Sequence, residues 1–153
     1  MTYEEYKNKK QEEFNDLPIF YAFSNEQFEA AMNERGLTLK DTDKIFKLGD
    51  TGGFYLKKDA EIIRAYFSKQ DELSELMKDK TFATEAFLYE MNNHEYAINW
   101  QGDYDVCSCF CRCNFSKDKT FVEYLTEGTM ESLIPAFMEA RRKHSKIAEN
   151  WNW

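Results

Sequence analysis

The sequence lacks the short motifs on which several common enzyme classes depend. Only two histidines and two prolines occur among its 153 residues, and no HExxH, GxSxG or GK[ST] motif is present. These absences argue against a histidine-based metal site, a serine hydrolase and a P-loop nucleotide site. The N-terminal stretch MTYEEYKNKKQEEF has no apolar segment of the secretory kind, and no apolar run approaches the length of a membrane span.

Positive charge is also scarce. The 28 acidic residues outnumber the 20 basic ones, which gives a net charge of -8. A nucleic-acid-binding surface needs a basic stripe to displace phosphate counterions, and anionic membranes attract basic segments. We therefore expect no direct binding to nucleic acid or membrane, a cytoplasmic location, and partners with basic surfaces.

Aromatic residues, by contrast, are plentiful. They make up 16% of the chain, and hydrophobic residues make up 42%. Because each buried ring removes a large apolar area from water, such a chain can close a core without metal or disulfide staples. We predict an α+β fold in one compact domain over residues 1–153, with residues 149–153 as a tail and no cofactor. Four to five helices would surround a small sheet that includes a β-hairpin.

Residues 82–100 supply the apolar centre of this prediction. Ala83, Phe87, Met91 and His94 recur at steps of three and four, which places them on one face of a helix. Such a helix cannot bury its apolar stripe alone, so the segments before and after it must cover it.

The clearest local signal begins at Ser24. Ser24 can cap a helix, and Gln27 stands where a capping box needs it. Phe23 and Phe28 occupy the positions of a hydrophobic staple across that cap. Gly36 supplies the left-handed residue that ends the helix.

Further elements follow from apolar patterning and turn residues. Apolar runs at 45–48 and 54–56 flank a glycine-bearing loop at 49–53, which predicts the β-hairpin. Residues 121–125 form a short β-prone run. Pro135 either kinks the last helix or marks its first turn. Other helices are predicted over residues 3–17, 60–78 and 128–148.

Four cysteines alternate along the segment 107–113, namely Cys107, Cys109, Cys111 and Cys113. The alternation allows a strand, and a helical turn that buries Cys107 fits about as well. Thiolates bind zinc, so a zinc-stabilised module is one alternative. Because the segment has no CxxC pair, one ion could not reach all four sulfurs without a sharp bend. We favour reduced thiols packed in the core.

A second group that could carry chemistry is His94, Glu95 and Tyr96, together with Asp50 of the glycine-bearing loop. An imidazole beside a carboxylate and a phenol can perform acid–base work, which leaves a small enzyme or ligand-binding domain as an alternative. The structural interpretation, which we favour, is a histidine that closes the end of a helix. His144 lies in a basic helix end and is expected to be solvated.

The candidate partner-binding surface combines charge with aromatic side chains. The helix that begins at Ser24 carries several carboxylates, and two tryptophans lie among the last three residues of the chain. Exposed tryptophans would form an adhesive patch, and a row of carboxylates can take the place of phosphates in a nucleic-acid-binding cleft. The residues of this surface are Glu26, Glu29, Glu34, Trp151 and Trp153.

Three segments carry a resemblance: 14–32 (FNDLPIFYAFSNEQFEAAM), 41–60 (DTDKIFKLGDTGGFYLKKDA) and 92–96 (NNHEY). Together they resemble a family of small, uncharacterised proteins of phages, prophages and gut bacteria. The family has no established activity, so the resemblance assigns no catalytic residue. It implies a phage context, in which small acidic proteins often bind and block host machinery such as CRISPR and other defence complexes.

Taken together, the sequence predicts a small acidic binding protein rather than an enzyme. It would act by stoichiometric occlusion of a host protein, such as a nucleic-acid-binding defence complex. If phage-encoded, it would work in the host cytoplasm.

Overall fold

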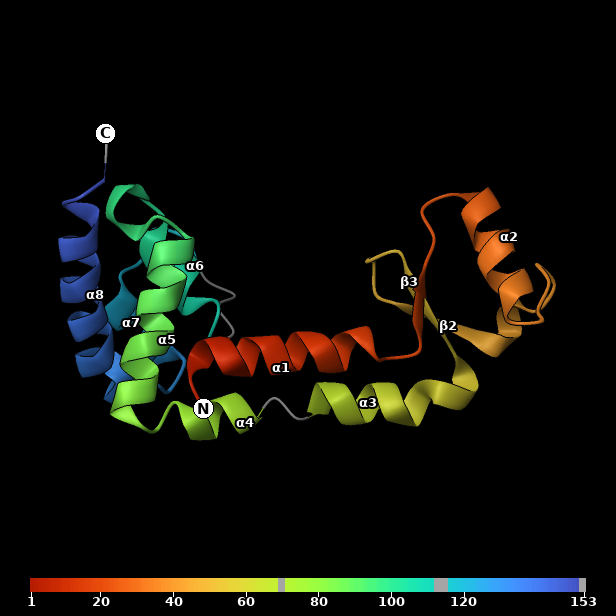
Figure 1. Ribbon diagram of the computed structural model, residues 1–153, viewed down its shortest axis with the longest axis horizontal. Helices are drawn as coiled ribbons and strands as arrows, with labels where there is room; N and C mark the ends of the chain where they lie inside the picture. The colour runs from red at the N-terminus through yellow and green to blue at the C-terminus, as the bar shows by residue number, and fades with distance from the viewer. Residues whose placement is uncertain (69–70, 112–115, 152–153) are drawn as a thin grey trace. The chain divides into compact units, whose positions relative to one another are not determined.

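The computed structural model describes residues 1–68, 71–111 and 116–151. The chain divides into two compact units, and the single domain over residues 1–153 stays a prediction. Unit 1 comprises Met1–Lys9 and Gln70–Trp153, and unit 2 comprises Lys10–Lys69. Figure 1 labels helices and strands of both units.

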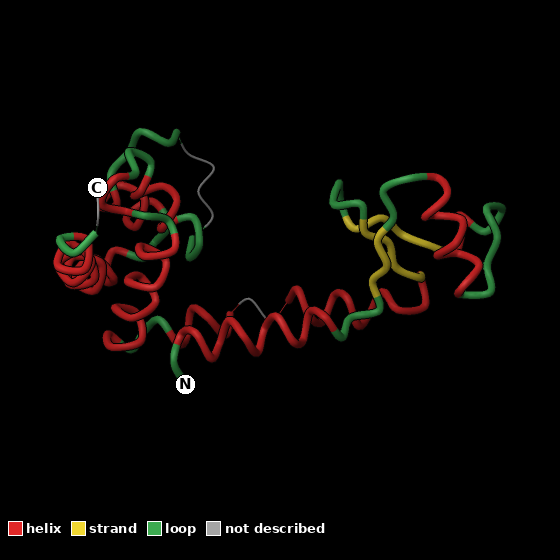
Figure 2. Tube along the Cα trace, turned by 45° about the horizontal axis from the view of Figure 1, so that its top comes forward, coloured by secondary structure: helices red, strands yellow, loops and turns green. Residues whose placement is uncertain are grey.

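The strands of the described chain lie in unit 2 and form one antiparallel sheet (Figure 2). Strands β2 (Ile45–Leu48) and β3 (Gly53–Leu56) form the predicted hairpin, and β1 (Ile19–Tyr21) pairs with the other side of β3. The strand order is therefore β1-β3-β2. This hairpin beside helices confirms the α+β class.

Helix α2 (Asn25–Glu34) covers one face of the sheet. The Ser24 side chain accepts a hydrogen bond from the backbone N–H of Gln27, as predicted for its cap. Gly36 has φ 72 and ends the helix. Phe28 packs on Phe54 with ring centroids 5.0 Å apart, and Met32 is fully buried. Helix α3 (Ala60–Ser68) and the short turns η1 (Thr42–Lys44) and η2 (Lys57–Asp59) complete the unit.

The predicted staple between Phe23 and Phe28 is wrong. Phe23 is 76% exposed and stacks on Tyr21 instead, with ring centroids 6.4 Å apart. Phe28 turns to the sheet, where it packs on the half-buried ring of Phe54.

Unit 1 is helical and is built on the packing of α5 (Lys80–Asn93) against α8 (Ile134–Ala148). Ala83, Phe87 and Met91 are fully buried, which confirms the predicted stripe. Phe87 packs edge-on against Phe137 of α8 at 5.0 Å. Helix α1 (Tyr3–Asn15) belongs to this unit as far as Lys9, and its Tyr3 packs on Phe82.

The remaining helices correct several sequence predictions. The expected helix 60–78 corresponds to α3 and α4 (Asp71–Leu76), with residues 69–70 outside the described part. The β-prone run is helix α7 (Phe121–Glu127), because Thr120 and Glu123 form a capping box. The cysteine segment begins as helix α6 (Gly102–Cys107). Pro135 lies in the first turn of α8, where proline is tolerated.

Short turns connect the helices of unit 1. The apolar centre leaves helical geometry at Glu95, whose φ is 51, and continues into the turn η3 (Tyr96–Ile98); η4 (Glu131–Leu133) precedes α8. Across the described segments, no helix combines the length and apolarity that a bilayer span requires.

Candidate functional site

The most unusual polar group of unit 1 is Glu90, a carboxylate buried on α5. Its Oε1 accepts hydrogen bonds from the Tyr3 hydroxyl at 3.1 Å and the Lys7 ammonium at 2.8 Å. Both donors come from the first two turns of α1. A buried charge needs such partners, because leaving water without them is costly.

The second oxygen of Glu90 faces a thiol and an imidazole. Cys109 Sγ donates to Oε2 at 3.2 Å, and His94 Nε2 lies 3.4 Å from the same oxygen. The Cys109 sulfur and His94 Nε2 are 3.8 Å apart. Glu90 and His94 are four positions apart on α5, so they share a helix face. Cys109 is in the turn that follows α6.

The surroundings of Glu90 favour its charged form. Burial raises the pKa of Glu90, but the hydrogen bonds from Lys7, Cys109 and Tyr3 and the charge of Lys7 together lower it below its ordinary value, so the carboxylate is ionised. Burial, reinforced by the Glu90 charge, raises the pKa of Cys109 to about 12. In this arrangement the thiol is therefore protonated at neutral pH and is no nucleophile.

The predicted ligand-binding group does not come together as a set. His94 is the C-cap residue of α5 and turns toward Cys109. Tyr96 donates a hydrogen bond to Asp103 instead, and burial raises its pKa. Glu95 is exposed, and Asp50 belongs to the β2–β3 turn of unit 2.

The three described cysteines also have separate environments. Cys107 is fully buried in the core of unit 1, as the favoured interpretation predicted. Cys111 is half-buried, with its sulfur 3.1 Å from the Cys107 carbonyl. Cys113 lies outside the described residues. Among the described side chains, the cluster of three groups able to hold a metal is Glu90, His94 and Cys109. Zinc bound by the four cysteines stays a prediction.

Unit 2 carries a different feature, an open sheet face of aromatic rings. Side chains alternate along strands, so Phe54 points to α2 while its neighbour Tyr55 points away. Phe46 lies opposite Tyr55 in the register, with ring centroids 5.7 Å apart. Tyr21 and Phe46 are 42% and 41% exposed. We call Tyr21, Phe23, Phe46 and Tyr55 the aromatic face.

The predicted partner-binding residues divide between the units. Glu26, Glu29 and Glu34 are exposed on α2 of unit 2. Trp151 belongs to unit 1, where its ring packs edge-on against His144 at 5.3 Å. Trp153 lies outside the described residues.

His144 itself is buried, so its predicted solvation is wrong. Its Nε2 accepts a hydrogen bond from the Ala97 backbone N–H at 3.1 Å, which requires an unprotonated Nε2. Its Nδ1 lies 2.8 Å from Asn92 Oδ1 and is the protonated nitrogen in this arrangement. Burial lowers the pKa of His144, in agreement with a neutral ring.

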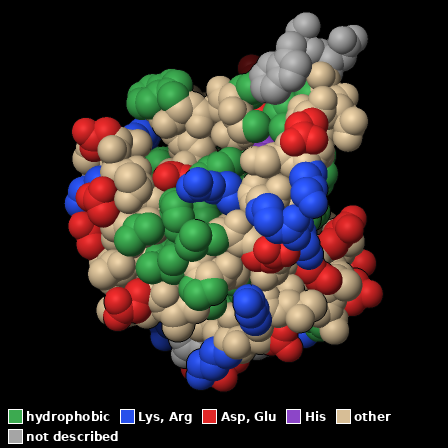
Figure 3. All heavy atoms as spheres, turned by 90° about the vertical axis from the view of Figure 1, so that its left-hand side faces the viewer, with side chains coloured by type: hydrophobic (Ala, Val, Ile, Leu, Met, Phe, Trp, Pro, Cys, Tyr) green, Lys and Arg blue, Asp and Glu red, His purple; other side chains and the backbone are tan. Residues whose placement is uncertain are grey.

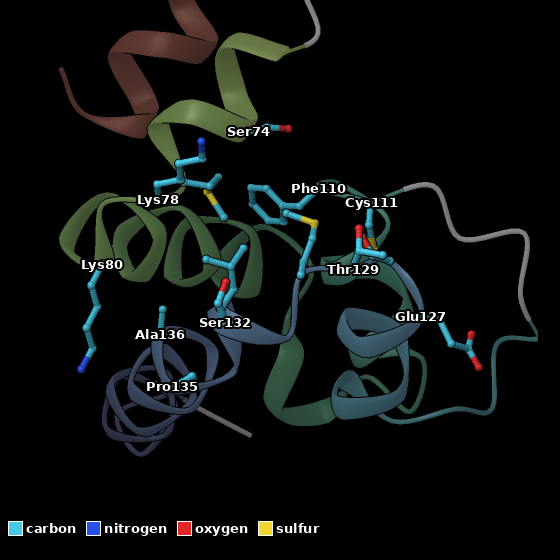
Figure 4. Close-up of a pocket in the computed structure, with 14 residues that line it drawn as sticks. Ser74, Lys78, Lys80, Phe110, Cys111, Glu127, Thr129, Ser132, Pro135 and Ala136 are labelled. Atoms are coloured by element: carbon cyan, nitrogen blue, oxygen red, sulfur yellow. The ribbon is translucent and has the colours of Figure 1, made fainter.

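Unit 1 also contains a cavity of about 850 Å³ (Figure 4). Ser74, Lys78, Phe110, Cys111 and Thr129 are among the residues that line it. Its size suits a small molecule. Its lining includes none of the residues of the predicted ligand-binding group.

The surface of unit 1 is not uniformly acidic. On the side that carries α8, apolar side chains gather beside Lys and Arg side chains (Figure 3). Met138 of α8 is exposed, and the basic residues Arg141 and Arg142 follow it on the same helix.

The fold and these sites define a small α+β protein that joins a helical unit with a buried carboxylate–thiol–imidazole cluster to a unit with an aromatic sheet face. The chain belongs to a family of unknown function (DUF7659), whose model matches residues 2–120. Comparisons with curated proteins and with solved structures gave no match.

Proposed function

We propose that the protein acts by binding another protein through unit 2 and thereby covering a functional surface of that partner. The observation that carries this proposal is the aromatic face. Exposed rings that touch one another are the typical anchors of protein interfaces, because they bury much apolar area at little conformational cost. Phe23 and Tyr21 stack in this way and remain exposed.

Charge favours a basic partner. The chain has a net charge of -8, and Glu26, Glu29 and Glu34 of α2 are exposed. Carboxylates on the binding unit accelerate encounter with a positively charged surface through long-range attraction and reject acidic competitors. The acidic residues would thus select the partner, and the aromatic face would hold it.

The resemblance to small phage and prophage proteins supports a host protein as the partner, such as a nucleic-acid-binding defence complex, whose basic surface would attract the carboxylates of unit 2. Occlusion of this kind needs equal amounts of the two proteins and no catalytic group.

Affinity capture followed by titration tests the proposal. The tagged full-length protein is incubated with lysate of the bacterium that carries the gene, and proteins retained at equal stoichiometry are identified by mass spectrometry. The retained protein is then purified and titrated. We expect Phe23→Ala with Phe46→Ala to weaken binding by about 30-fold or more, the loss of a typical hot spot.

Matched variants separate the two contributions. Glu26→Lys, Glu29→Lys and Glu34→Lys together should slow association, whereas the same reversal at exposed Glu85, Glu131 and Glu149 of unit 1 should not. Ile62→Ala removes an exposed apolar side chain elsewhere in unit 2 and serves as the aromatic control. Binding that is equal for all variants, or capture of no stoichiometric protein, would refute the proposal.

A further inference from the structure

We propose that Glu90, His94 and Cys109 form a binding site for a single zinc-type divalent ion. The three groups supply one carboxylate oxygen, one imidazole nitrogen and one sulfur, and these atoms all lie within 4.8 Å of one another. The site involves unit 1 alone and is independent of the protein-binding function proposed for unit 2.

The spacing of the donor atoms is that of a tetrahedral zinc site. Zinc binds sulfur at about 2.3 Å and nitrogen or oxygen at about 2.0–2.2 Å, so its donors lie about 3.4–3.6 Å apart. The observed separations are 3.2 Å for oxygen to sulfur, 3.4 Å for oxygen to nitrogen and 3.8 Å for sulfur to nitrogen. Each lies within about 0.4 Å of the tetrahedral value, so an ion needs only small side-chain shifts.

The donor set selects the class of ion. Magnesium and calcium prefer shells of oxygen ligands, which this cluster does not provide. Imidazole with thiolate suits zinc and its chemical relatives, including cobalt(II). Ionised Glu90 and a Cys109 thiolate would together neutralise the two charges of the ion, and binding would release the thiol proton.

Outer contacts already orient one of the three ligands. Tyr3 and Lys7 hold Oε1 of Glu90, which leaves Oε2 directed at the cluster. Such partners are the usual surroundings of metal ligands. The Lys7 side chain is 42% exposed, so its ammonium can move outward when a cation enters.

Three protein ligands leave a fourth position of the tetrahedron for another group. The His94 side chain is 32% exposed, so this position is within reach of solvent. Sites with three protein ligands and one exchangeable position hold water or a small ligand, whereas purely structural zinc sites are closed by four protein ligands.

Cobalt(II) provides a direct test, because a thiolate bound to cobalt gives an intense near-ultraviolet charge-transfer band. The full-length protein is stripped with a chelator, titrated with cobalt(II) and then with zinc. We expect the band to saturate at one cobalt per chain and to disappear when zinc displaces cobalt.

Cysteine variants locate the ion. Cys109→Ser should abolish the band and weaken zinc binding by more than the roughly 10–100-fold that the loss of an outer partner costs. Cys111→Ser, a matched change two residues away, should leave both unchanged. His94→Gln should keep a cobalt–sulfur band but require more cobalt to saturate it. Circular dichroism of each variant shows whether it is folded.

Two results would overturn the proposal. One is a wild-type protein that develops no cobalt–thiolate band. The other is a band that survives Cys109→Ser and vanishes with Cys111→Ser, because that pattern would place the ion on other thiols.

Discussion

A single buried carboxylate organises the polar interior of unit 1. Glu90 accepts hydrogen bonds from Tyr3, Lys7 and Cys109, and it lies beside His94. Because so many partners depend on one side chain, its charge matters more to stability than that of the exposed glutamates around it.

Replacing this carboxylate tests its role in stability. Glu90→Gln keeps the shape but removes the charge that Lys7 and Tyr3 contact, and we expect it to lower the free energy of unfolding by roughly 1–3 kcal/mol. Glu85→Gln on the same helix is exposed and should stay within about 0.5 kcal/mol of the wild type. Urea denaturation measures both. Equal stabilities for the two variants would contradict this prediction.

His144 predicts a pH dependence of stability. Its folded pKa lies below the ordinary value of 6.5, so the unfolded chain binds more protons in the interval between the two values. The contribution of buried His144 to stability should therefore be fully present above about pH 6.5, and it should be lost as the pH falls toward the folded pKa. Thermal unfolding followed by tryptophan fluorescence suits this test, because all three tryptophans lie outside residues 10–69.

The control for that experiment is His144→Gln. Gln cannot become protonated, so the variant should be less stable at neutral pH but should lose the additional decline below about 6.5. A wild-type protein whose unfolding midpoint does not change from pH 7 to pH 5 would show that the buried ring is not held neutral.

At the scale of elements, the β2–β3 turn and the aromatic face depend on each other. Gly52 has φ 79, and a Cβ atom there would lie 2.4 Å from Cε1 of Phe23. Gly49 in the same turn has φ 55, but a Cβ atom there would meet no heavy atom of the described residues within 4 Å. Substitution at Gly49 thus costs backbone strain alone, whereas substitution at Gly52 also displaces Phe23.

This difference gives a paired prediction. Gly49→Ala should destabilise unit 2 by about 1 kcal/mol, and Gly52→Ala by about 1 kcal/mol more, because Phe23 must leave its place. Chemical denaturation measures the stability, and NMR shifts of the Phe23 ring report its displacement. Identical effects of the two variants would show that the Phe23 ring can move aside without lowering the stability.

Local sequence signals predicted the elements well where the deciding contacts are local. The cap at Ser24, the stop at Gly36 and the hairpin are set by neighbours within a few residues. The run 121–125 is helical although its side chains are β-prone, because the Thr120–Glu123 capping box determines the helix.

The candidate sites were only partly predictable for the same reason. The four-residue spacing of Glu90 and His94 was readable as one helix face. Cys109 joins them from a separate element, 15 positions from His94, and periodicity does not specify such a contact. The basic residues around His144 suggest an exposed ring. The sequence does not show that Ala97 and Asn92, from distant segments, form hydrogen bonds with the ring and bury it.

At the scale of the whole molecule, the core of unit 1 extends further along the sequence than the family match does. The match covers residues 2–120, but Tyr124, Leu125 and Phe137 beyond it are fully buried in that core. The described residues 121–151 are therefore part of the structural unit rather than an appendage to it.

Truncation tests this dependence. A chain ending at residue 120 would uncover Phe87 and Met91 on α5, and we expect it to lose cooperative unfolding and to bind a hydrophobic dye. A chain ending at residue 150 keeps α8 and should unfold cooperatively, with some loss of stability because Trp151 no longer covers His144. Cooperative unfolding of the shorter chain would show that residues 2–120 suffice for the core.

The two oxygens of Glu90 have one further consequence. They share a single delocalised charge, so a cation that draws electron density toward Oε2 leaves Oε1 a poorer acceptor for Lys7 and Tyr3. Ion binding between Cys109 and His94 should therefore loosen the start of α1. Conversely, a more firmly attached α1 should lower the affinity for the ion. The carboxylate would thus couple ion binding at Oε2 to the attachment of α1 at Oε1. Amide hydrogen exchange in the first turns of α1 would measure this coupling.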